Sequence, residues 1–179
     1  MVFHTNKNRI DVTHPTAVAY LAKVLPHKNF ETEFVTPHGT IDYIAQIKNG
    51  KLFIYEVKTA DDKRGLDYFI KQMRRYTKYI TKKFSKSWEA YLVGTDKMLD
   101  SVEKRIEIAE ALPNSIGLAM LDFSKKENGL PSFVRLCKSA GYKALSDKER
   151  LKKTLKNSWN QPFSLKEIKE LKSAYLREL

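Results

Sequence analysis

The chain has 179 residues, the length of one ordinary domain, and its 42% hydrophobic and 30% charged residues are typical of a folded core with a charged surface. No apolar run is long enough to span a bilayer. The single cysteine, Cys137, excludes an internal disulfide framework and a cysteine-clustered zinc site, and we expect it to be a small buried residue. A net charge of +12 favours an anionic partner such as nucleic acid.

The first third of the chain predicts one helix followed by three strands. Pro15 suits the first turn of a helix, and apolar residues then recur at helical spacing until Pro26. Alternating or apolar runs bounded by turn residues predict strands over residues 30–35, 40–47 and 52–59. The second and third strands are separated by Lys-Asn-Gly-Lys, which favours a hairpin.

Two acidic residues and a lysine fall on this predicted hairpin. Asp42 is on its first strand, while Glu56 and Lys58 are two residues apart on the second and therefore project from one face. Carboxylates bind a hard cation through oxygen, and a lysine can orient or deprotonate the attacking water. Solvated edge charges are the alternative, but their apolar neighbours predict a buried strand, where charges are rare without pairing or function.

The hairpin loop decides whether Asp42 and Glu56 can share a metal. A two-residue turn would direct Asp42 away from Glu56. A three-residue loop over residues 48–50, with Gly50 in the left-handed region as a bulge, places them opposite each other. The site therefore predicts the bulged loop, and one face would then carry Thr40, Asp42, Glu56 and Lys58.

The middle of the chain alternates between helix and strand. A helix is predicted from about residue 64 to 83, followed by a strand over residues 88–93. A second helix carries Leu99, Val102, Ile106 and Ala109 on one side and ends before Pro113. The apolar strand over 116–123 is expected to be buried on both faces. The order α-β-β-β-α-β-α-β predicts an α/β fold with a mixed sheet.

The last third changes character. Residues 124–129 are polar and rich in turn formers, and two capping boxes, at Ser146 with Glu149 and at Ser164 with Glu167, predict the starts of helices. We therefore expect a core over residues 1–123 and a helical C-terminal extension over residues 124–179 packed on it.

The pattern of Asp42 followed by Glu56-Val57-Lys58 on a hairpin resembles the PD-(D/E)xK nuclease superfamily, although Ile41 replaces its usual proline. The resemblance covers about Pro15 to Val93 and implies a restriction-endonuclease-like α-β-β-β-α-β core. It also implies that Asp42, Glu56 and the Val57 carbonyl bind Mg²⁺, with Mn²⁺ as a possible substitute, and that Lys58 assists the water that attacks a phosphodiester. Glu31, Glu33 or a histidine could complete such a site.

A second motif is similar to the Gln-x-x-x-Tyr motif of RecB-like members. Gln72 and Tyr76 are one helical turn apart, and the resemblance implies that they contact the DNA backbone. They could equally flank the apolar stripe of their helix. The histidine of the RecB-like pattern has His14 and His27 as candidates. The solvent side of the same helix is either a solvated face or a site for a second stretch of duplex, and it carries Lys71, Arg74, Arg75, Lys78 and Lys82.

These patterns predict a cytoplasmic, Mg²⁺-dependent DNA endonuclease with Asp42, Glu56 and Lys58 as catalytic residues. Its partner would be DNA rather than a membrane, and it could form a homodimer. Endonuclease and exonuclease behaviour are not separated by the sequence. The rival hypotheses are a non-catalytic nucleic-acid-binding module and a subunit of a larger assembly that retains the nuclease fold.

Overall fold

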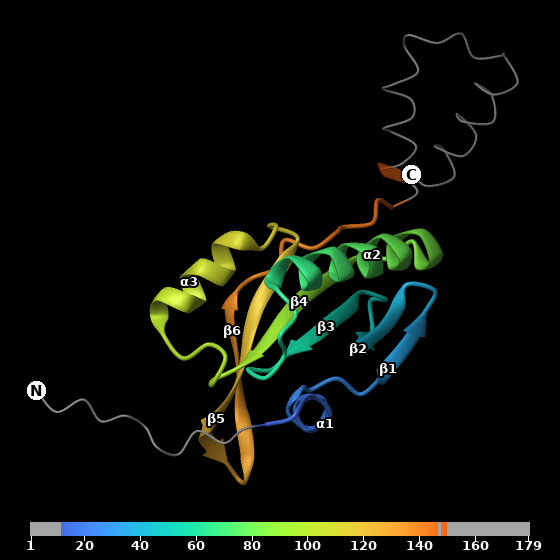
Figure 1. The fold of residues 1–179 in the computed structure, drawn as a ribbon. Coiled ribbons are helices and arrows are strands. Elements are labelled where there is room, and N and C mark those ends of the chain that lie inside the picture. Colours follow the sequence, from blue (N-terminus) through green and yellow to red (C-terminus); the bar gives the residue numbers. More distant parts are fainter. Residues whose placement is uncertain (1–11, 147, 150–179) are drawn as a thin grey trace, which may run out of the picture. The chain divides into compact units, whose positions relative to one another are not determined.

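The described residues form an α/β fold in which three helices pack on a six-stranded mixed sheet (Figure 1). The computed structural model describes residues 12–146 and 148–149. The chain divides into two units, residues 1–142 and 143–179, and the first contains the sheet. Its elements are α1 (His14–Val24), β1 (Phe30–Thr36), β2 (Gly39–Gln46), β3 (Leu52–Lys58), α2 (Leu66–Phe84), β4 (Trp88–Thr95), α3 (Val102–Ala111), β5 (Ile116–Glu127) and β6 (Leu130–Cys137).

The strands lie in the sheet in the order in which they occur in the chain, from β1 to β6. The pairs β1–β2, β2–β3 and β5–β6 are antiparallel, whereas β3–β4 and β4–β5 are parallel. A parallel pair needs a crossover connection, which α2 and α3 provide. The mixed sheet predicted from the order of helices and strands is therefore confirmed.

Two hydrophobic cores lie on opposite faces of the sheet. One packs beneath α2 and α3, the other against α1, and Figure 1 shows the helices on these two sides. On β3, Leu52 and Ile54 face the first core, while Phe53, Tyr55 and Val57 face the second. Burial on both faces explains why β3 and β4 are almost continuously apolar.

The bulged hairpin loop predicted between β2 and β3 is present. The Ile47 amide donates to the Lys51 carbonyl at 3.0 Å, and the Gly50 amide donates to the Ile47 carbonyl at 2.8 Å. Gly50 has a φ of 80°, which glycine adopts without a Cβ penalty. The register pairs Tyr43 with Tyr55, as a three-residue loop requires.

The chain after Phe123 differs from its predicted helical extension. β5 continues to Glu127 and turns at Asn128 and Gly129, both at positive φ, into the edge strand β6. The last residues of β5 extend beyond the core and are exposed, so their polar sequence is typical of a loop as well as of a strand. Cys137, predicted to be buried, is exposed at the end of β6.

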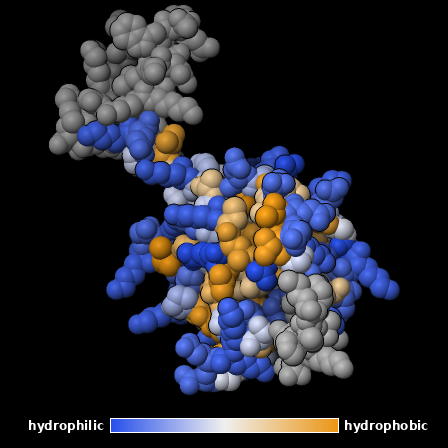
Figure 2. Space-filling view, turned by 90° about the vertical axis from the view of Figure 1, so that its left-hand side faces the viewer, coloured by the Kyte–Doolittle hydropathy of each residue, from blue (hydrophilic) through white to orange (hydrophobic). Residues whose placement is uncertain are grey.

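The inward face predicted for the second helix is wrong at two of its four residues, since only Leu99 and Ala109 pack in the core. α3 begins at Val102, after Leu99, so the helical phase differs from the predicted one. Ile108 is buried, while Val102 and Ile106 are 61% and 52% exposed. Figure 2 views the molecule from the side of α3 and shows apolar side chains gathered among hydrophilic ones on this face.

Little of the second unit is described. The capping box at Ser146 is confirmed, since the Glu149 carboxylate accepts the Ser146 amide at 2.8 Å and the Ser146 hydroxyl accepts the Glu149 amide at 3.2 Å. The Ser164 box and the predicted helix after it lie outside the described residues. In the described part of the chain, no helix is long and apolar enough to cross a membrane.

Candidate functional site

The candidate site lies where β2 separates from β3. Their paired register runs from Gln46 with Leu52 only as far as Tyr43 with Tyr55. Regular pairing would direct the Val57 amide of β3 at the main chain of β2. This amide donates instead to Asp42 Oδ2 at 2.7 Å. The side chain of Asp42 therefore fills the gap between the two strands.

β1 follows the same irregularity. Glu33, which regular pairing would set opposite Asp42, has a φ of 55° and is exposed. In addition, Ile41 and Ile44 both pack in the core beneath α2, so the alternation of β2 between the two faces is interrupted at Asp42. This bulge allows Asp42 to meet groups from both faces of the sheet.

Asp42 and Glu56 form a buried pair of carboxyl groups, 6% and 4% exposed. Burial raises the pKa of Glu56 well above its ordinary value and the negative charge of Asp42 raises it further, while a hydrogen bond from the Asp42 backbone acts in the opposite direction. Glu56 Oε2 is buried and has no hydrogen-bond partner among the described residues. A buried oxygen without a donor is unusual, and an ordered water or a bound ion is a common partner of such a group.

His14 reaches this pair from the first turn of α1. Its Nε2 lies 3.1 Å from Asp42 Oδ2, and this hydrogen bond raises the pKa of the imidazole despite partial burial. Of the two histidines that the sequence left as candidates, the structure brings His14 to the site. His27 lies 3.4 Å from the Tyr55 hydroxyl instead.

The place of Lys58 on the strand predicted that it lies beside the carboxylates, but its ammonium is hydrogen-bonded elsewhere. Its ammonium donates to the backbone carbonyls of Asp62 at 3.1 Å and Arg64 at 2.6 Å. The charges that act most on Glu56 are those of Asp42, Arg64 and Asp62. Lys58 turns away from the carboxylates because the loop after β3 folds back over the end of the strand and offers it two carbonyl oxygens. Burial lowers the pKa of Lys58.

Arg64 is the cation whose charge acts on Glu56, and the sequence did not single it out. Its guanidinium forms a bidentate pair with Asp62, with Nε–Oδ1 and Nη2–Oδ2 distances of 3.0 and 2.7 Å. Its side chain is still 47% exposed. Its positive charge lowers the pKa values of Glu56 and His14. The sequence signal for this cation was the spacing of Asp62 and Arg64, two residues apart just after the predicted strand.

Tyr76, predicted to contact DNA, is fully buried and cannot do so directly. Its hydroxyl donates to the Thr40 carbonyl at 2.8 Å and accepts a hydrogen bond from the Gln72 side chain. Burial and the negative charge of Glu56 raise the pKa of Tyr76. Gln72 is partly buried, and its Oε1 has no partner in the described part of the chain. Tyr76 thus holds the start of β2, two residues before Asp42, against α2.

Gly39 makes this anchor possible. Its φ is 124°, and an added Cβ would lie 2.9 Å from the Tyr76 hydroxyl. We expect Gly39→Ala to lower the free energy of unfolding by about 1–3 kcal/mol, because it combines backbone strain with a displaced hydroxyl. Urea unfolding measures the loss. In a Tyr76→Phe background the loss should be smaller, since the clashing oxygen is gone; an equal loss in both backgrounds would show that the contact is irrelevant.

The donor set of the site suits one class of metal. Residues 12–146 and 148–149 contain no group of three or more His, Cys, Asp or Glu side chains that could hold a metal ion. Within the described residues the site offers the carboxylates of Asp42 and Glu56, and Val57, next to Glu56 on β3, is buried in the second core. This fits Mg²⁺, which keeps several waters and is bound through one or two carboxylates plus substrate phosphates.

Comparisons with known proteins assign no function. No family model matches the sequence, and no curated protein matches it. Among solved structures, the chain is similar to the SPO1766 protein of unknown function from Silicibacter pomeroyi. The identity is 13%, with 86% of this chain and 99% of that chain covered and a TM-score of 0.42.

Proposed function

We propose that this protein is a metal-dependent DNA endonuclease whose α1–β4 segment is a PD-(D/E)xK nuclease core. The observation that carries the proposal is the buried Asp42–Glu56 pair at the separation of β2 and β3, with Glu56 Oε2 free of any described partner. Two neighbouring carboxylates destabilise each other when both are ionised in a buried place. A divalent cation would remove that repulsion while leaving both carboxylates ionised.

Asp42 and Glu56 would hold the metal, with the Val57 carbonyl as a further ligand by the resemblance. Bound Mg²⁺ would polarise the phosphoryl oxygen and lower the pKa of a water. The Val57 amide and His14 orient Asp42 by sharing its Oδ2. Groups that fix a ligating carboxylate in this way commonly contribute to metal affinity.

Two cations complete the proposal. Arg64, half exposed and held by Asp62, would bind a non-bridging phosphate oxygen. Lys58 would leave its two carbonyl partners to orient or deprotonate the attacking water. Its lowered pKa brings the neutral amine closer to the working pH, which favours that role.

Lys58→Ala is expected to lower kcat by about 100-fold or more with little change in KM, because general-base assistance acts in the transition state. The measurement is steady-state cleavage of a labelled duplex in Mg²⁺. Lys63→Ala, in the same loop, serves as the matched control. An unchanged kcat for Lys58→Ala would leave this lysine as a support of the loop only.

A substrate panel tests the proposed activity: linear duplex, supercoiled circle, single strand, flap and four-way junction, each with Mg²⁺, with Mn²⁺ and with EDTA. We expect metal-dependent cleavage of at least one substrate, and cleavage of the closed circle would mark an endonuclease. Binding without cleavage under every condition would contradict the proposal. It would support a non-catalytic nucleic-acid-binding module, a second candidate that is favoured by the hydrogen bonds of Lys58 to loop carbonyls in place of the carboxylates. The predicted homodimer stays a prediction.

A further inference from the structure

The outer surface of α2 is strongly basic. The helix has a single acidic residue, Asp67, in its first turn. Its six cationic residues are all exposed, and they are Lys71, Arg74, Arg75, Lys78, Lys82 and Lys83. Cations near the C-terminal end of a helix are favoured by the helix dipole, which accounts for the last two. The dipole does not account for those nearer the middle.

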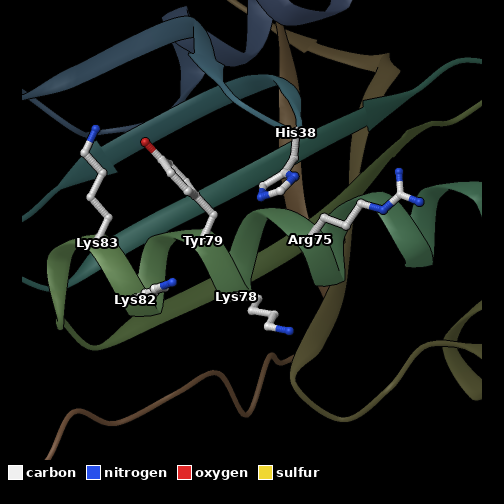
Figure 3. A pocket seen from close by; sticks show the side chains of 6 residues that line it. All are labelled: His38, Arg75, Lys78, Tyr79, Lys82 and Lys83. Carbon is white, nitrogen blue, oxygen red and sulfur yellow. The ribbon is translucent and has the colours of Figure 1, made fainter.

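Part of the outer surface of α2 forms a pocket, and we call the lining of this pocket the α2 cationic surface. Its residues are His38, Arg75, Lys78, Tyr79, Lys82 and Lys83 (Figure 3). Figure 3 shows Arg75, Tyr79 and Lys83 projecting toward the side of His38, while the other two lysines point away. The His38 and Tyr79 rings pack edge to face, with centroids 6.0 Å apart, and the Lys83 ammonium lies 5.4 Å from the Tyr79 centroid.

The cations of this surface have no counter-charge in the described residues. The ion pairs found there involve Asp42, Asp62 and Glu89, and none includes a cation of α2. Like charges one turn apart, such as Lys78 and Lys82, destabilise a helix. Ion pairing within the described residues does not offset this repulsion, whereas a bound polyanion would offset it and would gain affinity by releasing its counterions.

The α2 cationic surface begins beside the carboxylate site. Tyr76 bonds to Thr40, two residues before Asp42, and Arg75 precedes Tyr76 in α2. His38 lies in the turn between β1 and β2 that leads into the same strand. From Arg75 to Lys83 the helix rises roughly 12 Å, the length of three to four base pairs at about 3.4 Å each.

We propose that the α2 cationic surface binds the phosphodiester backbone of nucleic acid next to the carboxylate site, with Arg75 and Lys83 as the main phosphate contacts. The surface thus sets where the strand lies outside the scissile position. This proposal rests on the proposed function for the identity of the ligand, but it concerns binding alone and needs no metal.

The test compares the full-length parent with Arg75→Ala/Lys83→Ala and with Lys125→Ala/Lys126→Ala. The control removes the same charge from exposed positions on β5, in the hairpin with β6. Fluorescence anisotropy in EDTA measures binding of a labelled single strand of about 20 nucleotides and of a duplex of about 20 base pairs across a salt series. At about 3.4 Å per base pair, these probes are longer than the surface. Thermal melting confirms that all three proteins are folded.

We expect the α2 variant to bind at least about tenfold more weakly, with the slope of log K against log salt reduced by about 1.8 for duplex or about 1.4 for single strand. The probe, duplex or single strand, that shows the larger loss of affinity identifies the form of nucleic acid that the surface binds. Affinity and slope equal to those of the β5 control would overturn the proposal. Because binding is measured in EDTA, the expected loss in a protein that never cleaves would support this surface and contradict the nuclease.

Discussion

Replacing Asp42 with asparagine is expected to lower Mg²⁺-dependent DNA cleavage by at least about 100-fold, equivalent to about 2.7 kcal/mol of transition-state stabilisation. Asparagine has the same shape, and its amide oxygen can still accept the hydrogen bond of the Val57 amide. The separation of β2 from β3 should therefore persist. What is lost is the negative charge that, with Glu56, would hold the metal.

The matched control for this substitution is Asp122→Asn. Asp122 is also a buried aspartate that accepts a backbone amide, from Ser124 at 3.0 Å, but it lies at β5 and outside the candidate site. A readout other than activity is the melting temperature with and without Mg²⁺. A metal that binds only the folded protein raises it, and we expect this rise in the parent and the control but not in Asp42→Asn. Equal losses of cleavage in the two variants would contradict the assignment.

Glu56→Gln is expected to abolish cleavage and at the same time to make the metal-free protein more stable at neutral pH. The pKa of Glu56 is raised by its burial and by the charge of Asp42, so ionising it in the folded protein is unfavourable. Glutamine removes that charge without changing the volume. Proteins often become more stable when a functional group is removed, because the fold holds functional sites in a strained state that binding requires.

The pH dependence follows from the direction of this shift. Below the ordinary pKa of 4.5, Glu56 is protonated in both the folded and unfolded chain, and parent and variant should be similar. As the pH rises above 4.5, the unfolded chain loses the proton while the folded chain retains it, so the stability of the parent falls until the raised pKa is passed. The advantage of Glu56→Gln should grow over the same window, by several degrees in melting temperature at about 2–4 °C per kcal/mol.

Glu89 provides a control of opposite sign in the same sheet. It is 8% exposed, but the hydrogen bonds from Lys51 and from the Tyr91 hydroxyl outweigh its burial and lower its pKa. Its ionised form stabilises the fold above the ordinary pKa, and Glu89→Gln should therefore lower the melting temperature at neutral pH. Melting curves from pH 4 to 8, in EDTA, compare the three proteins around the ordinary pKa of 4.5. A Glu56→Gln variant that melts below its parent at neutral pH would contradict the raised pKa of Glu56.

Local signals in the sequence determined much of the fold. The helix after Pro15, the long helix that became α2, and the hairpin with its Gly50 bulge each depend on side-chain periodicity or turn chemistry within a few residues. The same holds for the capping box at Ser146. The sequence also brought Asp42 and Glu56 to neighbouring positions, because a three-residue loop dictates the register of a hairpin.

The tertiary structure alone decided how those residues meet. β6 was missed although Asn128 and Gly129 form a two-residue turn, a local hairpin signal, because its edge position leaves its apolar residues exposed and its strand pattern weak. Tyr76 is buried because Gly39 leaves room for its hydroxyl at β2, and Lys58 turns to carbonyl groups supplied by the loop after β3. The separation of β2 from β3 at Asp42, which creates the candidate site, arises because its carboxylate replaces a backbone acceptor. Such a choice depends on which hydrogen bonds the packed chain can satisfy, and no local pattern records it.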